Sequence, residues 1–263
     1  MIRGLYTSAI GMAVQMKRLD AATHNLANAD TAGFKRDIVI TQAFSDVMMR
    51  RVRDYEMQGI STAAGASGLN LGPGSLGLIV NTLHRDFSAG SLQPTGRPLD
   101  LALDLSGFFE ISHTNAAGET TLKYTQTGSF TIRDDGTLIT LSGHPVMSES
   151  GSPIILPSGA IKITPQGVIL VNDEIVDTLR LVTFEDLSTL RSFGDNLFDT
   201  TEDSVILAYA GQVLQGYLET SNVNVVREMM EIIALSRAYE ANSRMIAIAD
   251  QTLGQAVNEI ARR

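Results

Sequence analysis

The feature that most constrains the fold is a heptad pattern in residues 221–263. Stepping by four and three residues in turn from Val225 gives eleven positions, of which eight are apolar, and no proline interrupts the run. This spacing predicts one long helix with a seam of side chains that faces a partner helix. Ser221, Asn222 and Asn224 stand at its start and are candidate N-cap residues. The seam positions are Val225, Met229, Ile232, Ser236, Tyr239, Ser243, Ile246, Asp250, Leu253, Val257 and Ile260.

A second stripe with the same alternation lies at the other end of the chain, broken only by Thr23. Its positions are Ile2, Leu5, Ala9, Met12, Met16, Leu19, Thr23 and Leu26. This helix is expected to end near Asn28, Thr31 and Gly33, which are residue types that stop helices. We therefore expect two terminal helices that form a coiled-coil-like layer, paired either within one chain or between subunits.

The middle of the chain has a different pattern. Residues 36–84 are expected to form an arm and a linker, because 59–77 is rich in Gly, Ser and Ala and has no periodicity. From about residue 85 the apolar period is two and turns are closely spaced, which predicts an all-β sandwich or partly open barrel over 85–205. Within it, strands at 121–125 and 129–132 are expected to pair as a hairpin. The predicted fold class is α+β, with a terminal helical assembly domain (1–35 with 215–263) and an inserted all-β domain.

Composition excludes several functional classes. The net charge of −9 and the pI near 4.9 argue against a nucleic-acid partner. There is no cysteine for a disulfide or thiolate chemistry. No apolar run is long enough for a transmembrane segment. Gln15, Lys17 and Arg18 interrupt the early apolar residues, so no cleavable signal peptide is expected.

No pattern in the sequence predicts catalysis. The four histidines lie in unlike segments without metal-ligand spacing. Residues 72–77 fit G-x-G-x-x-G, but they follow a glycine-rich loop and precede a predicted strand, so the context for dinucleotide binding is missing. We therefore expect no enzyme, no cofactor and no metal ion.

Several segments resemble motifs of the bacterial flagellar rod and hook axial proteins. They are residues 25–36, 90–103, 107–109, 124–130, 215–229 and 237–243, in the family's order. The length and the inserted domain are similar to rod proteins rather than to the longer hook protein. Departures at 104–106 and at Arg227 leave the proximal or distal rod subtype open.

The resemblance implies a structural subunit of the flagellar basal-body rod. Such a subunit is exported unfolded by the flagellar (type III) export apparatus, without a cleavable signal, to the periplasm-spanning rod. It then assembles helically with itself and with other rod or hook axial proteins into a hollow shaft that transmits torque from motor to hook. The alternatives are a hook or junction component of the axial structure, or a ligand-binding β-domain carried on a helical oligomerisation stalk.

The expected assembly interface combines the two stripes with the two terminal motifs. Its residues are Leu5, Met12, Met16, Leu19, Asn25, Leu26, Asn28, Thr31, Gly33, Phe34, Ser221, Asn222, Asn224, Val225, Met229, Ile232, Tyr239, Asn242, Ile246 and Leu253.

Overall fold

The computed structural model describes residues 2–43, 78–115 and 118–260. The chain divides into two compact units. Unit 1 comprises Met1–Leu26, Asp37–His84 and Val225–Arg263, and unit 2 comprises Ala27–Arg36 and Arg85–Asn224. Most of the predicted linker, including its glycine-rich part at 59–77, lies outside the described residues. The expected α+β class is confirmed, with a helix near each end and a large β-rich region between them.

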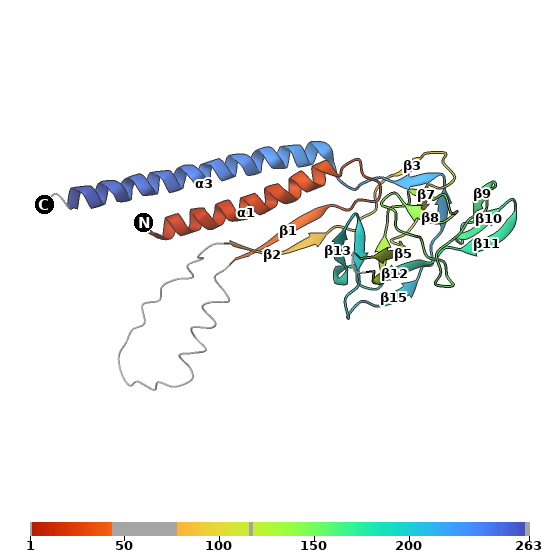
Figure 1. Ribbon diagram of the computed structural model, residues 1–263. Coiled ribbons are helices and arrows are strands. Elements are labelled where there is room, and N and C mark those ends of the chain that lie inside the picture. The colour runs from red at the N-terminus through yellow and green to blue at the C-terminus, as the bar shows by residue number, and fades with distance from the viewer. Residues whose placement is uncertain (1, 44–77, 116–117, 261–263) are drawn as a thin grey trace, which may run out of the picture. The chain divides into compact units, whose positions relative to one another are not determined.

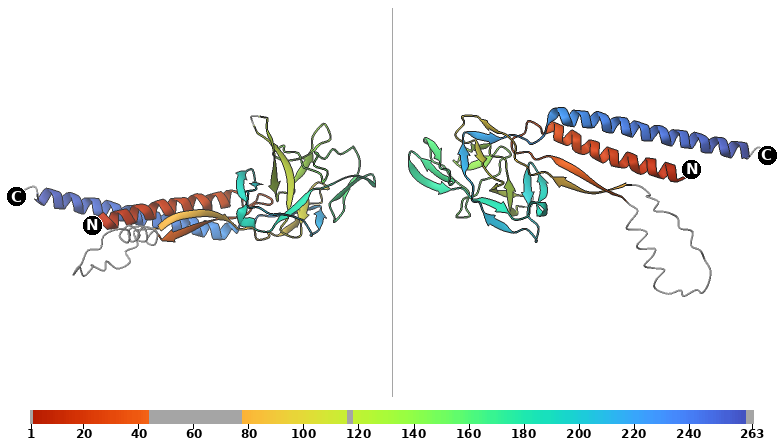
Figure 2. Two further views of the ribbon diagram at one scale, coloured as in Figure 1. Left: turned by 90° about the horizontal axis from the view of Figure 1, so that it is seen from below. Right: turned by 180° about the vertical axis from the view of Figure 1, so that it is seen from behind.

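Unit 1 contains the two terminal helices, α1 (Ile2–Ala27) and α3 (Val225–Ile260). They lie side by side and run antiparallel in every view (Figure 1, Figure 2). Asn242 of α3 faces Gly11 of α1, so the two helices contact each other within one chain. The same unit holds a two-stranded ribbon of β1 (Asp37–Ala43) and β2 (Leu78–Arg85).

The less exposed face of α3 is only partly the predicted seam. Ile232, Tyr239, Ile246 and Leu253 are half-buried, as the heptad spacing predicts. The other less exposed positions of α3 lie mostly one residue before the predicted ones. They are the buried Glu228 and Leu235 and the half-buried Asn242, Ala249 and Ala256. Of the predicted positions between them, Ser236 is half-buried, whereas Met229, Ser243, Asp250 and Val257 are exposed. In α1 the buried positions are Val14, Ala21, Ala22 and Asn25. The less exposed faces of the two helices therefore mix large, small and polar residues.

Unit 2 is built on a six-stranded antiparallel sheet. Its order is β13 (Arg191–Gly194), β14 (Leu197–Asp199), β6 (Thr120–Thr125), β5 (Phe108–Thr114), β12 (Leu181–Phe184) and β15 (Ile206–Ala208). A three-stranded sheet joins β9 (Ile161–Ile163), β10 (Val168–Val171) and β11 (Glu174–Thr178). Two-stranded pairs join β16 (Val213–Gln215) to β4 (Leu101–Leu103), β17 (Tyr217–Glu219) to β3 (Leu92–Pro94), and β7 (Phe130–Ile132) to β8 (Leu138–Thr140). A short 3-10 helix, η1, covers Leu187–Thr189.

The hairpin predicted from 121–125 and 129–132 is wrong. Strand β6 pairs with β5 and β14, while β7 pairs with β8. The reason lies at Gly128, where a Cβ atom would collide with the carbonyl of Leu101. The chain passes so close to Leu101 there that it leaves the sheet of β6, and Ser129 bridges to Asp100 instead.

Two apolar clusters occupy opposite faces of β5, because successive strand residues point to opposite sides. Phe109 and Ile111 belong to the larger cluster. Phe108 belongs to the smaller one, in which its ring meets that of Phe184 edge-on at a centroid distance of 5.2 Å. A sheet buried on both faces at its centre is a rigid platform for the loops and edges around it.

Candidate functional site

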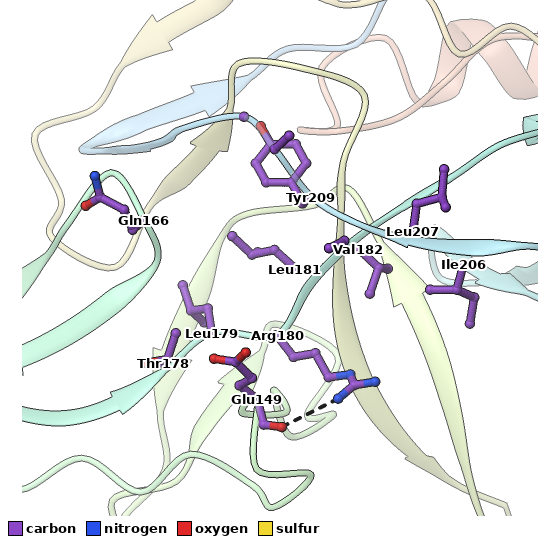
Figure 3. A pocket seen from close by; sticks show the side chains of 13 residues that line it. Glu149, Gln166, Thr178, Leu179, Arg180, Leu181, Val182, Ile206, Leu207 and Tyr209 are labelled. Atoms are coloured by element: carbon purple, nitrogen blue, oxygen red, sulfur yellow. Dashed lines mark hydrogen bonds between the residues drawn. The ribbon is translucent and has the colours of Figure 1, made fainter.

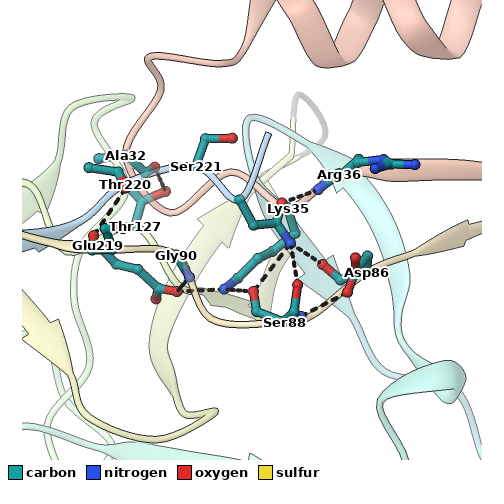
Figure 4. Close-up of polar contacts among 12 residues, drawn as sticks. Ala32, Lys35, Arg36, Asp86, Ser88, Gly90, Thr127, Glu219, Thr220 and Ser221 are labelled. Atoms are coloured by element: carbon teal, nitrogen blue, oxygen red, sulfur yellow. Dashed lines mark hydrogen bonds and ion pairs between the residues drawn. The ribbon is translucent and has the colours of Figure 1, made fainter. Parts of the chain in front are cut away.

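The segments that lead from one unit to the other are tied together in unit 2 by a buried ion pair (Figure 4). Lys35 is only 2% exposed, and its Nζ lies 2.6 Å from Oε1 of Glu219. The same ammonium donates to the carbonyl of Ser88 at 2.9 Å, and the same carboxylate oxygen accepts from the Gly90 N–H at 2.7 Å. Because each charge has further hydrogen bonds, the cost of burying the pair is offset. Three chain segments are joined at this point.

Two motif asparagines complete this junction by hydrogen-bonding to backbone. In unit 2, Asn222 accepts from the N–H of Arg36 at 2.8 Å and donates to the carbonyl of Asp86 at 2.8 Å. In unit 1, Asn25 donates to the carbonyl of Asp37 at 2.9 Å and accepts from its N–H at 2.8 Å. The Asn25 amide thus acts like a strand neighbour for Asp37, whereas the Asn222 amide links the backbones of Arg36 and Asp86. Asn222 holds a neighbouring chain segment, which the N-cap prediction did not anticipate.

The rest of the N-terminal motif packs into unit 2. Gly33 has φ of +68°, and a Cβ atom there would lie 2.8 Å from the carbonyl oxygen of Gln126, so the position requires glycine. Its N–H donates to the carbonyl of Glu219 at 2.8 Å. Phe34 is fully buried, with the Arg85 guanidinium over its ring. Thr31 Oγ1 donates to the side-chain oxygen of Asn28 at 3.3 Å, closing the turn after α1.

Polar groups of the junction lower the pKa of the Asp86 carboxyl. The N–H of Ser88 donates to Asp86 at 3.0 Å, and this bond holds the pKa of Asp86 below its usual value. Burial opposes the shift, and Arg36 and Lys35 add to it. Asp86 is therefore ionised at neutral pH.

The predicted interface residues differ in their burial. Asn25, Gly33 and Phe34 are buried within the single chain, so the structure gives them an intrachain role. The stripe residues Met16, Val225 and Met229 are exposed. The others are half-buried or, for Asn224, exposed, and comprise Leu5, Met12, Leu19, Leu26, Asn28, Thr31, Ser221, Asn222, Asn224, Ile232, Tyr239, Asn242, Ile246 and Leu253. Their contacts between subunits remain a prediction.

A second row of apolar side chains lies on α3 and was not predicted from the sequence. Met230, Ile233, Met245 and Ile248 are all exposed. They occur in pairs three residues apart, a spacing that places both members of a pair on one helix face. This signal is present in the sequence but was hidden by the stronger heptad stripe beside it.

A groove of about 580 Å³ lies in unit 2 at the end of strands β12 and β15 (Figure 3). Its walls are about half aliphatic and half polar, and the polar residues include Glu149, Gln166 and Arg180. Arg180 donates to Glu110 at 3.1 Å and, more weakly, to the carbonyl of Glu149 at 3.5 Å. The Tyr209 hydroxyl donates to Asp104 at 2.8 Å, and burial raises the pKa of this tyrosine. An open groove of this kind suits an extended protein segment.

Two of the histidines that are far apart in the sequence meet in unit 2. The rings of His113 and His144 stand edge to face with centroids 4.8 Å apart. Burial lowers the pKa of His144, and His113 lowers it further while Asp195 opposes the shift.

Across the described ranges, no three His, Asp or Glu side chains gather where a metal ion could be held. The described helices include none with a run long and apolar enough to cross a membrane.

Comparison with known proteins finds three family models along the chain. They are "Flagella basal body rod protein" over 5–35, "Flagellar hook protein FlgE/F/G D1 domain" over 102–171, and "Flagellar basal body rod FlgEFG protein C-terminal" over 214–259. The flagellar basal-body rod protein FlgG of Buchnera aphidicola subsp. Acyrthosiphon pisum is 34% identical over 264 residues, which cover 96% of this chain and 98% of the relative. The chain belongs to the flagellar basal-body rod protein family.

Other rod proteins match over nearly the whole chain. FlgG of Bacillus subtilis is 32% identical, covering 98% of this chain and 99% of the relative. FlgF of Caulobacter vibrioides is 31% identical over 90% of both chains. The family resemblance predicted from the terminal motifs is therefore confirmed. Lys35 lies in the N-terminal rod-protein model and Glu219 in the C-terminal one, so the buried ion pair joins the two.

Proposed function

We propose that this chain is a structural subunit of the flagellar basal-body rod, which assembles helically into the hollow shaft that carries torque from motor to hook. The observation that carries the proposal is the relationship to rod proteins over the full chain, including both terminal helices. In this proposal its partners are further copies of itself, other rod and hook axial proteins, and the flagellar export apparatus. Through that apparatus it reaches the periplasm-spanning basal body.

The terminal helices supply the contact between subunits in this proposal, as a coiled-coil-like layer. Exposed apolar side chains line α3, and Met16 and Tyr6 add to them on α1. Large apolar patches on a single subunit mark surfaces that are covered in an assembly. The exposed methionines can fit irregular neighbours, since their side chains are unbranched and polarizable. A contact between unlike faces that does not close on itself produces an open helical filament.

The junction around Lys35 suits the transmission of torque. Three of the four places where the chain passes between the units, at 36/37, 84/85 and 224/225, lie within a few residues of Lys35, Ser88 or Asn222. Hydrogen bonds and an ion pair fix these segments to one another in unit 2. A drive shaft needs such stiffness where chain segments enter a domain, because loose segments would absorb twist.

The proposal is tested by assembly of the purified full chain, followed by sedimentation and electron microscopy at rising concentration. The unaltered chain should form filaments. Met245→Asp places a charge on the exposed face of α3 and should raise the concentration needed for assembly at least about tenfold. Leu141→Asp, at an exposed apolar position of unit 2, is the matched control and should assemble normally. A chain that stays monomeric at every concentration, alone and with other axial proteins, would contradict the proposal.

A further inference from the structure

One edge of the six-stranded sheet in unit 2 is unprotected. Strand β15 is the last strand in the order, and Val205, Ile206 and Leu207 are 50%, 46% and 46% exposed. Edge strands normally carry charges, proline or a covering loop, because an apolar edge pairs readily with another strand. The run from Val205 to Ala208 has none of these charges or prolines.

The backbone of this edge is open to a further strand. The N–H of Glu185 donates to the carbonyl of Val205, so the pair 185/205 is hydrogen-bonded. The register then makes Thr183 and Leu207 the next hydrogen-bonded pair. Ile206 and Ala208 consequently point their N–H and C=O groups away from β12. Within the described residues, no hydrogen bond to these four groups is found.

The opposite edge of the same sheet has the direction needed to pair with it. All neighbouring strands in this sheet are antiparallel, so direction alternates across its six strands. The two edge strands, β13 and β15, therefore run in opposite directions. A second copy placed beside the first would bring its β13 antiparallel to β15, and the sheet would continue without a break in pattern. All four residues of β13 are exposed, and Phe193 is 48% exposed.

The charges agree with this direction. In antiparallel pairing, Arg191 at the start of β13 comes to the Ala208 end of β15. That end opens into the groove of Figure 3, whose wall includes the exposed Glu149. Arg191 is also exposed, and in the described part of the chain neither side chain has an ion pair. A guanidinium entering the groove would meet the Glu149 carboxylate, while Arg180, the cation of the same wall, is paired with Glu110. The aliphatic residues of the wall would contact the strand that carries Arg191.

We propose that β13 of one copy adds to β15 of the next copy, with Arg191 placed against Glu149 in the groove. This contact rests on the proposed rod function and gives unit 2 an assembly surface in addition to the terminal helices. It joins unlike edges, so two paired copies together still offer one free β13 edge and one free β15 edge. Such an interface propagates instead of closing into a dimer.

The edge is tested first with Ile206→Pro. Proline removes an N–H that points outward and leaves the bonds between β12 and β15 in place, so unit 2 should keep its melting temperature. Assembly of the full chain should require about tenfold more protein, equivalent to ~1.4 kcal/mol for each contact. Ile206→Val is the matched control and should assemble normally. Unchanged assembly by the proline variant would overturn the proposal and leave the rod function standing.

The identity of the occupant is tested by exchanging the charges. Arg191→Glu and Glu149→Arg should each weaken assembly, because each places like charges in the groove. The chain carrying both substitutions restores an opposite pair and should recover most of the lost assembly. Failure of the double variant to recover, with a normal circular dichroism spectrum, would show that Arg191 does not occupy the groove.

Cross-linking tests the contact even if filaments do not form. The chain has no cysteine, so Phe193→Cys and Leu207→Cys chains each carry a single thiol. When the two variants are mixed at high concentration and oxidised, a disulfide joining one of each should form. A Leu207→Cys chain that dimerises with itself instead would indicate pairing of β15 with β15. That result, or no cross-link between the two variants, would refute the proposal.

Discussion

Gly11 of α1 faces the side-chain amide of Asn242 of α3, and a Cβ atom on Gly11 would lie 3.0 Å from Nδ2 of that amide. The two terminal helices therefore approach closely at a point where one has no side chain and the other has a polar one. A single polar residue in a helix contact favours one register over others, at some cost in stability. This pair is the most direct evidence that α1 and α3 contact each other within one subunit.

Replacing Gly11 should separate the helices in proportion to the added volume. Gly11→Val inserts a branched side chain into the contact and should destabilise unit 1 by ~1–3 kcal/mol. Gly11→Ala should have a smaller effect, because the gain in helix propensity of up to ~1 kcal/mol offsets the tight contact. Thermal unfolding followed by the helical circular dichroism signal measures both. Asn242→Ala should rescue Gly11→Val by making room, and the absence of any rescue would place the strain elsewhere.

The buried ion pair of the junction gives a second prediction. Lys35→Met leaves the Glu219 carboxylate in a buried site without its cation, and should lower the unfolding free energy by ~3–5 kcal/mol. The double change Lys35→Met with Glu219→Leu should recover much of this loss, because no charge is then left uncompensated. Urea unfolding of the full chain gives the values.

The chain offers a matched control for this pair. Lys162 and Asp173 also lie 2.6 Å apart, but their side chains are 66% and 76% exposed. Because water screens an exposed pair, Lys162→Met should change stability by less than ~1 kcal/mol. Equal effects of Lys35→Met and Lys162→Met would mean that burial does not set the strength of the junction.

A third prediction separates two reasons why a position requires glycine, which are a positive φ angle and the close approach of neighbouring atoms. Gly33 and Gly143 both have positive φ, +68° and +88°, but only Gly33 has neighbouring atoms where a Cβ would stand. Gly143→Ala should cost ~1 kcal/mol from backbone strain alone. Gly33→Ala should cost more than that, because the methyl group also meets the backbone of Gln126. If thermal unfolding shows the same loss for both, the close approach at Gly33 is unimportant.

The helices and the β-rich middle were predictable, because heptad spacing and a period of two are local patterns in the chain. Which face of α3 is less exposed was predicted only in part. Met229 and Val257 are apolar and fit the heptad spacing, yet both are exposed. Asn242 faces inward because Gly11 of α1 leaves room for its amide, which depends on the partner helix and not on local hydrophobicity.

The roles of the motif asparagines also depended on distant segments. Asn222 was a good N-cap candidate from its position, yet it bonds to Arg36 and Asp86, more than a hundred residues away in the chain. The meeting of His113 with His144 likewise follows from pairing across the sheet. Sequence spacing identifies which side chains are suited to hydrogen bonding, but the fold decides which backbone groups they reach.

The last prediction concerns pH and follows from that histidine pair. Burial, together with the neighbouring His113, lowers the pKa of His144 from its ordinary value of 6.5, and Asp195 partly opposes this. A histidine with a lowered folded-state pKa binds protons more tightly when the protein is unfolded. Its contribution to stability is therefore fully present above pH 6.5 and is lost as the pH falls through the lower pKa of the folded state.

Unit 2 of the unaltered chain should accordingly lose stability between neutral and mildly acidic pH. His144→Gln keeps a polar side chain that cannot be protonated in this range, and should reduce the slope of melting temperature against pH. The decisive comparison is between the slopes of His144→Gln and of the unaltered chain, measured in identical buffers. If His144→Gln keeps the full acid sensitivity of the unaltered chain, protonation of His144 is not what destabilises the β-rich unit.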